Sequence, residues 1–214
     1  MTSKKLTASQ LAPMVADYHS AFPQLQLYGD DMLYRMGGLM AQSIWFDRLR
    51  TGAYRPTCRV HVLVAPSAQG GTVVLPQFLS IKVREITPQV HQRLLPEVVG
   101  ALKSEILLPL DKPLDELAVA ELLSNRSSGR PANAYALACL LAALGRSEEA
   151  HHWIGEYRTA IASLGLAPQL VDAERDAFLQ QIEEWLKLPE REVRFAQIVK
   201  QQKARLLGHS GEET

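Results

Sequence analysis

The sequence predicts an α+β fold, in which a small antiparallel sheet of about four strands packs on helices and an all-helical C-terminal half follows. Apolar residues alternate with their neighbours over residues 32–36 and 58–64, which is the period of a half-buried strand. Gly37-Gly38 suits a two-residue hairpin turn, because glycine tolerates positive φ. Beyond residue 87 the apolar residues recur at helical spacing.

A helix is expected at the start of the chain. Thr7 and Gln10 have the spacing of a capping box, in which each side chain bonds to the backbone amide of the other residue. Pro13 favours a kink or a later start, and Pro23 ends the helix. Residues 24–30 then connect this helix to the first strand.

The predicted sheet is an antiparallel meander. Its middle strand lies within residues 39–50. The consecutive apolar residues 44–46 place large side chains on both faces of this strand. One face is therefore expected to contact the core and the other to contact a helix or a partner. Residues 72–86 form the last strand, because apolar and polar residues alternate over residues 79–84. Pro76 indicates that this strand lies at an edge or starts after the proline.

The remaining chain is expected to be helical. Thr87 and Pro88 have the pattern of an N-cap followed by a proline at the first helical position. Small polar residues at 125–130 indicate a linker. The predicted organisation is therefore an α+β domain (1–124), the linker (125–130), a helical subdomain (131–208) and a polar tail (209–214).

Part of the helical subdomain resembles a known motif. The stretch ALACLLAALGRSEEAHHWIGEYRTAI, residues 136–161, has small residues at Ala138 and Ala142, Gly145 at a turn and the bulky Trp153. In these features it is similar to a single tetratricopeptide helical hairpin. The resemblance implies a helical hairpin and a binding role, whereas a plain αα-hairpin of the domain itself explains the same residues.

The composition is that of a soluble globular protein whose overall charge does not attract nucleic acids or anionic membranes. The formal net charge is zero, so we expect neither nucleic-acid binding nor attachment to an anionic membrane. Cys58 and Cys139 lie in apolar surroundings, which favours buried free thiols and a cytoplasmic location.

The candidate binding residues gather around the predicted middle hairpin. Arginines outnumber acids there, and aromatic residues and arginine dominate the energetics of protein interfaces. The hypothesis is a surface for a partner that is acidic at the contact. The candidate residues are Trp45, Phe46, Arg48, Arg50, Tyr54 and Arg55.

Motifs for catalysis, metal or cofactor binding are not evident, and we expect no cofactor. Glu148 and His152 are one helical turn apart and could share an ion, but a single pair at that spacing usually only stabilises a helix. His61 could act as an acid or base if Asp47 or Glu85 faced it, although an exposed structural histidine is the simpler interpretation.

The sequence thus favours a non-enzymatic, cytoplasmic protein-binding module. Its layout is similar to bacterial toxin-immunity proteins and to secretion adaptors, an analogy of class alone. One alternative is an enzyme with a cleft between the sheet and the helical half that uses His61 and a nearby carboxylate. Another is a homodimer that assembles through the helical hairpin.

Overall fold

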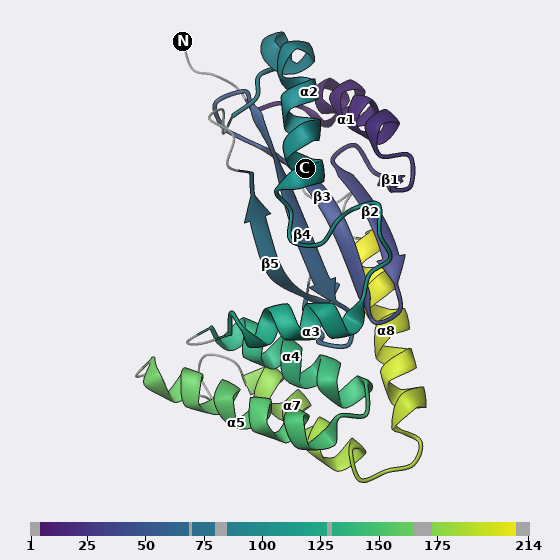
Figure 1. The fold of residues 1–214 in the computed structure, drawn as a ribbon, viewed down its shortest axis with the longest axis vertical. Coiled ribbons are helices and arrows are strands. Elements are labelled where there is room, and N and C mark those ends of the chain that lie inside the picture. Colours follow the sequence, from purple (N-terminus) through teal and green to yellow (C-terminus); the bar gives the residue numbers. More distant parts are fainter. Residues whose placement is uncertain (1–4, 69, 80–84, 128–129, 165–172, 209–214) are drawn as a thin grey trace.

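The computed structural model confirms the α+β class. It describes residues 5–68, 70–79, 85–127, 130–164 and 173–208. Over these residues the chain forms a five-stranded antiparallel sheet and seven helices, with the helices concentrated in the C-terminal half. Figure 1 shows the sheet in the middle of the molecule, one pair of helices near one end and a helical layer at the other.

The sheet is an up-and-down meander in the order β1-β2-β3-β4-β5. The strands are β1 (Gln26–Tyr28), β2 (Met32–Gly37), β3 (Met40–Arg48), β4 (Tyr54–Val62) and β5 (Thr72–Phe78). The hairpin turn predicted at Gly37-Gly38 joins β2 to β3, with Gly38 at a φ of +48°. The sequence-based count of four strands missed β1, because three residues are too short to show an alternating pattern. The predicted alternation over 80–84 lies outside the described residues.

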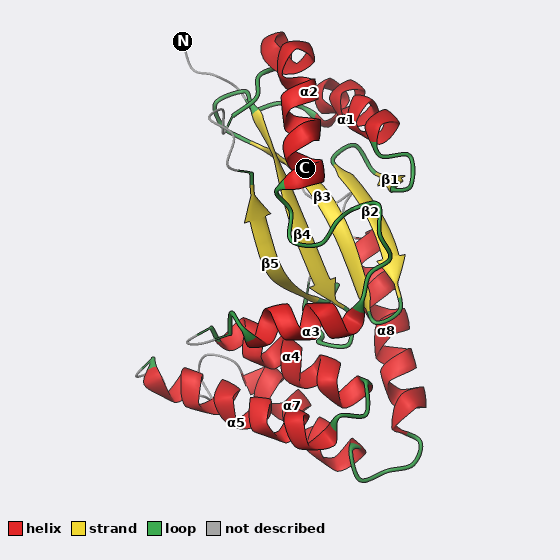
Figure 2. Ribbon diagram, viewed as in Figure 1, coloured by secondary structure: helices red, strands yellow, loops and turns green. Residues whose placement is uncertain are grey.

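One face of the sheet is covered by α1 (Ala8–Ala21) and α2 (Pro88–Ser104), which lie side by side at the upper end of the sheet in Figure 2. The predicted capping box opens α1, since the Thr7 hydroxyl accepts from the Gln10 amide and the Gln10 side chain accepts from the Thr7 amide. The apolar stripe of α1 then meets Leu33 and Ile44 of the sheet in one buried cluster.

A buried chain of polar groups joins these two helices to β4. The hydroxyl of Tyr54 lies 3.1 Å from that of Tyr18 and 2.7 Å from Nδ1 of His91, and Nε2 of His91 lies 3.0 Å from a carboxylate oxygen of Asp17. Burial raises the pKa of Tyr18 to about 12, so its hydroxyl stays protonated at neutral pH. This network of side-chain hydrogen bonds connects α1, β4 and α2.

Replacing Tyr54 with phenylalanine should lower the free energy of unfolding by about 1–3 kcal/mol, because both the Tyr18 hydroxyl and His91 Nδ1 then lose a buried partner. Tyr18→Phe is the matched control, with an expected loss of about 0.5–1.5 kcal/mol, because it removes one hydrogen bond. Urea denaturation measures both values. Equal losses would contradict the central position of Tyr54.

A layer at the far end of the sheet contains α3 (Glu116–Ser124), α4 (Pro131–Ala143), α5 (Ser147–Ser163) and α7 (Ala173–Trp185), and the last helix, α8 (Arg191–Gly208), leads away from it. Every residue of α4 from 133 to 142 is buried, as expected for a helix that is apolar on all sides. The cluster around α4 also contains Met40, Val62 and Val74 of the sheet. The hydrophobic core therefore continues across the predicted linker.

Helix α8 runs behind the sheet, on the face opposite α1 and α2 (Figure 1). Its Gln202 side-chain oxygen accepts from the backbone amides of Ser67, at 3.2 Å, and Gly71, at 2.9 Å. Both residues belong to the loop between β4 and β5, so this one buried amide fixes α8 to the sheet. Within the described residues, none of the helices has the length and apolarity needed to cross a membrane.

Candidate functional site

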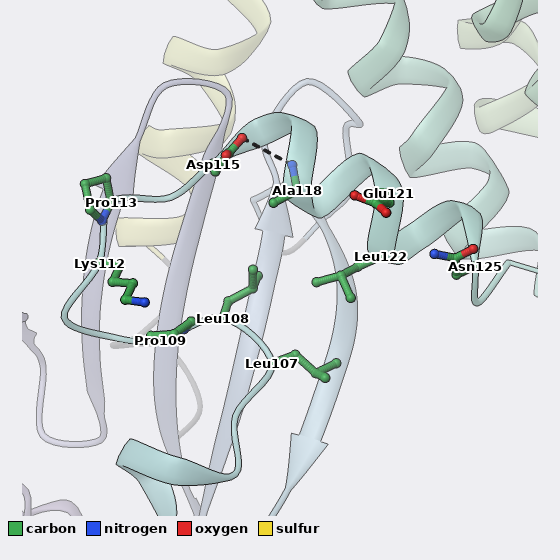
Figure 3. Close-up of a pocket in the computed structure, with 10 residues that line it drawn as sticks. All are labelled: Leu107, Leu108, Pro109, Lys112, Pro113, Asp115, Ala118, Glu121, Leu122 and Asn125. Atoms are coloured by element: carbon green, nitrogen blue, oxygen red, sulfur yellow. Dashed lines mark hydrogen bonds between the residues drawn. The ribbon is translucent and has the colours of Figure 1, made fainter.

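An open groove lies between the 107–113 segment and α3, and Figure 3 shows its lining. Its volume is about 380 Å³, near the lower end of the range for small-ligand pockets. Both walls come from the part of the chain between α2 and α4. The lining residues are Leu107, Leu108, Pro109, Lys112, Pro113, Asp115, Ala118, Glu121, Leu122 and Asn125.

Hydrogen bonds from the sheet hold the first wall in place. The Gln42 side chain donates to the Leu108 carbonyl at 2.7 Å, and Arg35 donates to the carbonyls of Pro109, at 2.7 Å, and Lys112. The Leu107 amide donates to the Gln77 side chain at 2.8 Å. Three strands thus fix the backbone of a segment that has no regular structure of its own, which makes this wall preorganised.

The second wall is fixed through the N-terminal turn of α3. The Asp115 carboxylate accepts from the amides of Leu117, at 2.9 Å, and Ala118, at 3.2 Å, and so caps the helix. The Glu116 carboxylate accepts from the Leu39 amide at 2.8 Å, which attaches α3 to the turn between β2 and β3. The Asp115 cap bond to Ala118 is drawn in Figure 3.

The groove combines apolar side chains with charged ones. Leu108, Ala118 and Leu122 provide apolar contact area, while Lys112 and Glu121 are exposed and carry opposite charges. The lining residues include no serine, threonine, cysteine, histidine or tyrosine. The groove can therefore hold an apolar group between an acidic and a basic neighbour.

The aromatic candidates from the sequence lie mainly in the core. Phe46 is 1% exposed and Tyr54 is 0% exposed, and both pack against α1. They cannot contact a partner while α1 is in place. Trp45 points to the opposite face, where it is half-buried and the Arg59 guanidinium lies 5.0 Å from its ring centre.

The arginine candidates remain at the surface. Arg48 forms a long ion pair with Asp31, at 4.0 Å, and Arg55 forms one with Glu85, at 3.9 Å. Arg50 is exposed in the turn that follows β3. The structure does not bring the six predicted residues into one surface, and a contact through the arginines stays a prediction.

His61 is buried, at 1% exposure, whereas the sequence suggested an exposed side chain. Its Nε2 lies 3.1 Å from the Ser43 hydroxyl, and among the described residues its Nδ1 has no hydrogen-bond partner. Burial, followed by the positive charge of Arg59, lowers the pKa of His61 to about 4. The imidazole is therefore neutral at pH 7.

The predicted carboxylate partners of His61 are engaged elsewhere. Asp47 accepts from Arg59 and from Thr57, each at 2.8 Å. Glu85 accepts from the Thr51 hydroxyl at 2.9 Å. Neither carboxylate contacts His61, so the acid-base pair suggested by the sequence does not form in this structure.

Both cysteines are buried and free, as the sequence indicated. Burial raises the pKa of the Cys58 thiol to about 12, which leaves it protonated and unreactive at neutral pH. In the part of the chain that the structure describes, no group of three or more potential metal ligands occurs.

The groove was not predicted from the sequence. The available signal was the proline-bounded link at 107–113, together with the polar side chains of Arg35, Gln42 and Gln77 at strand positions. No family model, curated protein or solved structure matches this chain. The α4–α5 hairpin is present, and its likeness to a tetratricopeptide unit stays a prediction.

Proposed function

We propose that this chain is a non-enzymatic protein-binding module that uses the groove between the 107–113 segment and α3 to hold a short segment of a partner. The observation that carries the proposal is the combination of an apolar lining, opposite charges and walls fixed by hydrogen bonds. A preorganised surface binds with a smaller loss of conformational entropy than a mobile one.

The apolar surface near the groove is larger than its lining. Leu117 is 55% exposed on α3, and it precedes Glu121 by one helical turn, so it stands beside the rim. A partner segment with one large apolar side chain would place that group against Leu108 and Leu122. An acid near Lys112 and a base near Glu121 would then set its direction.

A binding role agrees better with the location of the titratable groups than an enzymatic role does. The imidazoles of His61 and His91 are buried in other parts of the fold, at 1% and 2% exposure. Neither lines the groove. An immunity-like or adaptor-like role in the cytoplasm, with an acidic partner, is part of this proposal.

The test is selection of a library of displayed 12-residue peptides on the immobilised chain. Ala118→Trp fills the groove without removing a large side chain, and Ala177→Trp on α7, where Ala177 is exposed, is the matched control. Selected peptides should carry an apolar residue flanked by an acid and a base. They should bind Ala118→Trp at least about tenfold more weakly, a change of about 1.4 kcal/mol, and bind Ala177→Trp as they bind the parent chain.

Two results would overturn the proposal. One is the absence of any enriched peptide. The other is enriched peptides that bind Ala118→Trp and the parent chain equally well, because their contact site would then lie elsewhere.

A further inference from the structure

The groove follows one face of α3 from end to end. On this side its lining residues recur at spacings of three or four, and they are Asp115, Ala118, Glu121, Leu122 and Asn125. Asp115 is the N-cap of α3 and Asn125 is its C-cap, so this wall is about 15 Å long at 1.5 Å per residue. In Figure 3 Lys112 lies near the Asp115 end, and Asn125 lies at the opposite end.

Three exposed polar side chains of the groove are not used within the molecule. Among the described residues, the Lys112 ammonium, the Glu121 carboxylate and the Asn125 amide form no ion pair and no hydrogen bond. The Asp115 carboxylate, by contrast, is occupied by the cap of α3. A bound segment can therefore meet a cation, an anion and an amide in that order along the groove.

The Asn125 amide distinguishes between conformations of a bound segment. An asparagine side chain has one carbonyl acceptor and two N–H donors, which are the groups of a peptide bond. In an extended chain the N–H and C=O of one residue point to the same side and can bond to a neighbour. In the interior of a helix these groups already bond within the helix. The Asn125 amide can thus pair with the main chain of an extended segment and not with that of a helix.

The dimensions of the groove also suit an extended segment. At about 3.3 Å per residue, four or five residues of extended chain span the wall formed by α3. A helix of the same length and about 10 Å in diameter has a volume of roughly 1,200 Å³, which is well above the 380 Å³ of the groove. An extended segment can therefore enter the groove with its backbone, whereas a helix could insert only a row of side chains.

We infer that the partner segment lies in this groove in an extended conformation and that its main chain bonds to the Asn125 amide, an inference that rests on the proposed function. An acid, a large apolar residue and a base at alternate positions lie on one face of such a segment. The acid contacts Lys112 and the base contacts Glu121. The apolar side chain lies between them, against Leu108 and Leu122.

Two sets of fluorescent 12-residue peptides test the conformation. In one set glutamate, leucine and lysine occupy alternate positions with threonine between them. In the other set the same three residues have the helical spacing i, i+3 and i+7 with alanine between them. Both orders of the charges are made, because an extended chain can enter the groove in either direction. By fluorescence anisotropy, the better alternating peptide should bind at least about tenfold more tightly than either helical one, and Ala118→Trp should weaken its binding at least about tenfold.

Asn125→Ala tests the main-chain contact. Its matched control is Ser124→Ala, since Ser124 is exposed on α3 and does not line the groove. Asn125→Ala should weaken binding of the alternating peptide about tenfold, and Ser124→Ala should leave it unchanged. N-methylation of the peptide, one position at a time, removes single N–H donors. The most damaging N-methyl group should have little further effect on binding to Asn125→Ala, because its hydrogen-bond partner is already absent.

Three results would overturn this inference: tighter binding of a helical peptide, an equal effect of Asn125→Ala and Ser124→Ala, and no binding of any designed peptide. Far-UV circular dichroism checks that each variant is folded. The proposed function is judged separately, by the library peptides and their sensitivity to Ala118→Trp. Enriched groove peptides with helical spacing would remove the extended conformation and leave the proposed function standing.

Discussion

Replacing Gly70 with alanine is expected to lower the free energy of unfolding by roughly 3 kcal/mol or more. Gly70 has a φ of +81°, where a side chain is strained, and a Cβ at this position would overlap the backbone nitrogen and Cα of Leu206. Backbone atoms cannot rotate out of the way. Helix α8 would have to leave the loop, and the two hydrogen bonds accepted by Gln202 would be lost with it.

Urea denaturation measures the loss, and limited proteolysis should show faster cleavage within α8. The control is Gly100→Ala in α2, where the added Cβ would meet no described atom within 4 Å outside its chain neighbours and the surrounding helix backbone. This variant should be more stable by about 0.5–1 kcal/mol, because alanine is the better helix former. Unchanged stability of Gly70→Ala would mean that α8 does not lie against this loop in solution.

Acidification is expected to destabilise the fold through His61. Its pKa is lowered from an ordinary 6.5 to about 4 in the folded chain. Between these values the unfolded chain binds a proton that the folded chain does not, so stability is lost as the pH falls from about 6.5 to about 4. At 1.36 kcal/mol per pH unit the loss amounts to roughly 2–4 kcal/mol.

His61→Gln isolates this contribution, because glutamine keeps a polar group near Ser43 and does not titrate. Unfolding free energies of both proteins should be measured at several values between pH 7 and about pH 4.5. The parent chain should lose stability more steeply than the variant, since the carboxylates contribute equally to both. Parallel profiles would show that His61 titrates normally in the folded chain.

The separate elements were predictable because their signals are local. The capping box of Thr7 and Gln10 and the turn at Gly37-Gly38 each involve residues at most three positions apart. The meander follows from short turns, since an antiparallel pair needs only a hairpin. The exception is β1, whose three residues pair with β2 without a pattern of their own.

The position of the candidate surfaces was not predictable in the same way. Phe46 and Trp45 are adjacent, so alternation places them on opposite faces, but it does not say which face α1 covers. The groove depends on hydrogen bonds such as that between Gln42 and Leu108, which are 66 positions apart. Hydrophobic periodicity and capping patterns involve near neighbours in the sequence, so they cannot predict a contact between residues that far apart.

The sequence by itself determined the α+β class, the meander, most helix starts and the buried thiols, because propensity, capping and periodicity act between near neighbours. Only the tertiary structure decided that α8 covers the second face of the sheet, that His61 is buried beside Ser43 and that the 107–113 segment forms a wall with α3. These features depend on which distant surfaces pack together. That choice is made by the burial of the whole core, to which every element contributes.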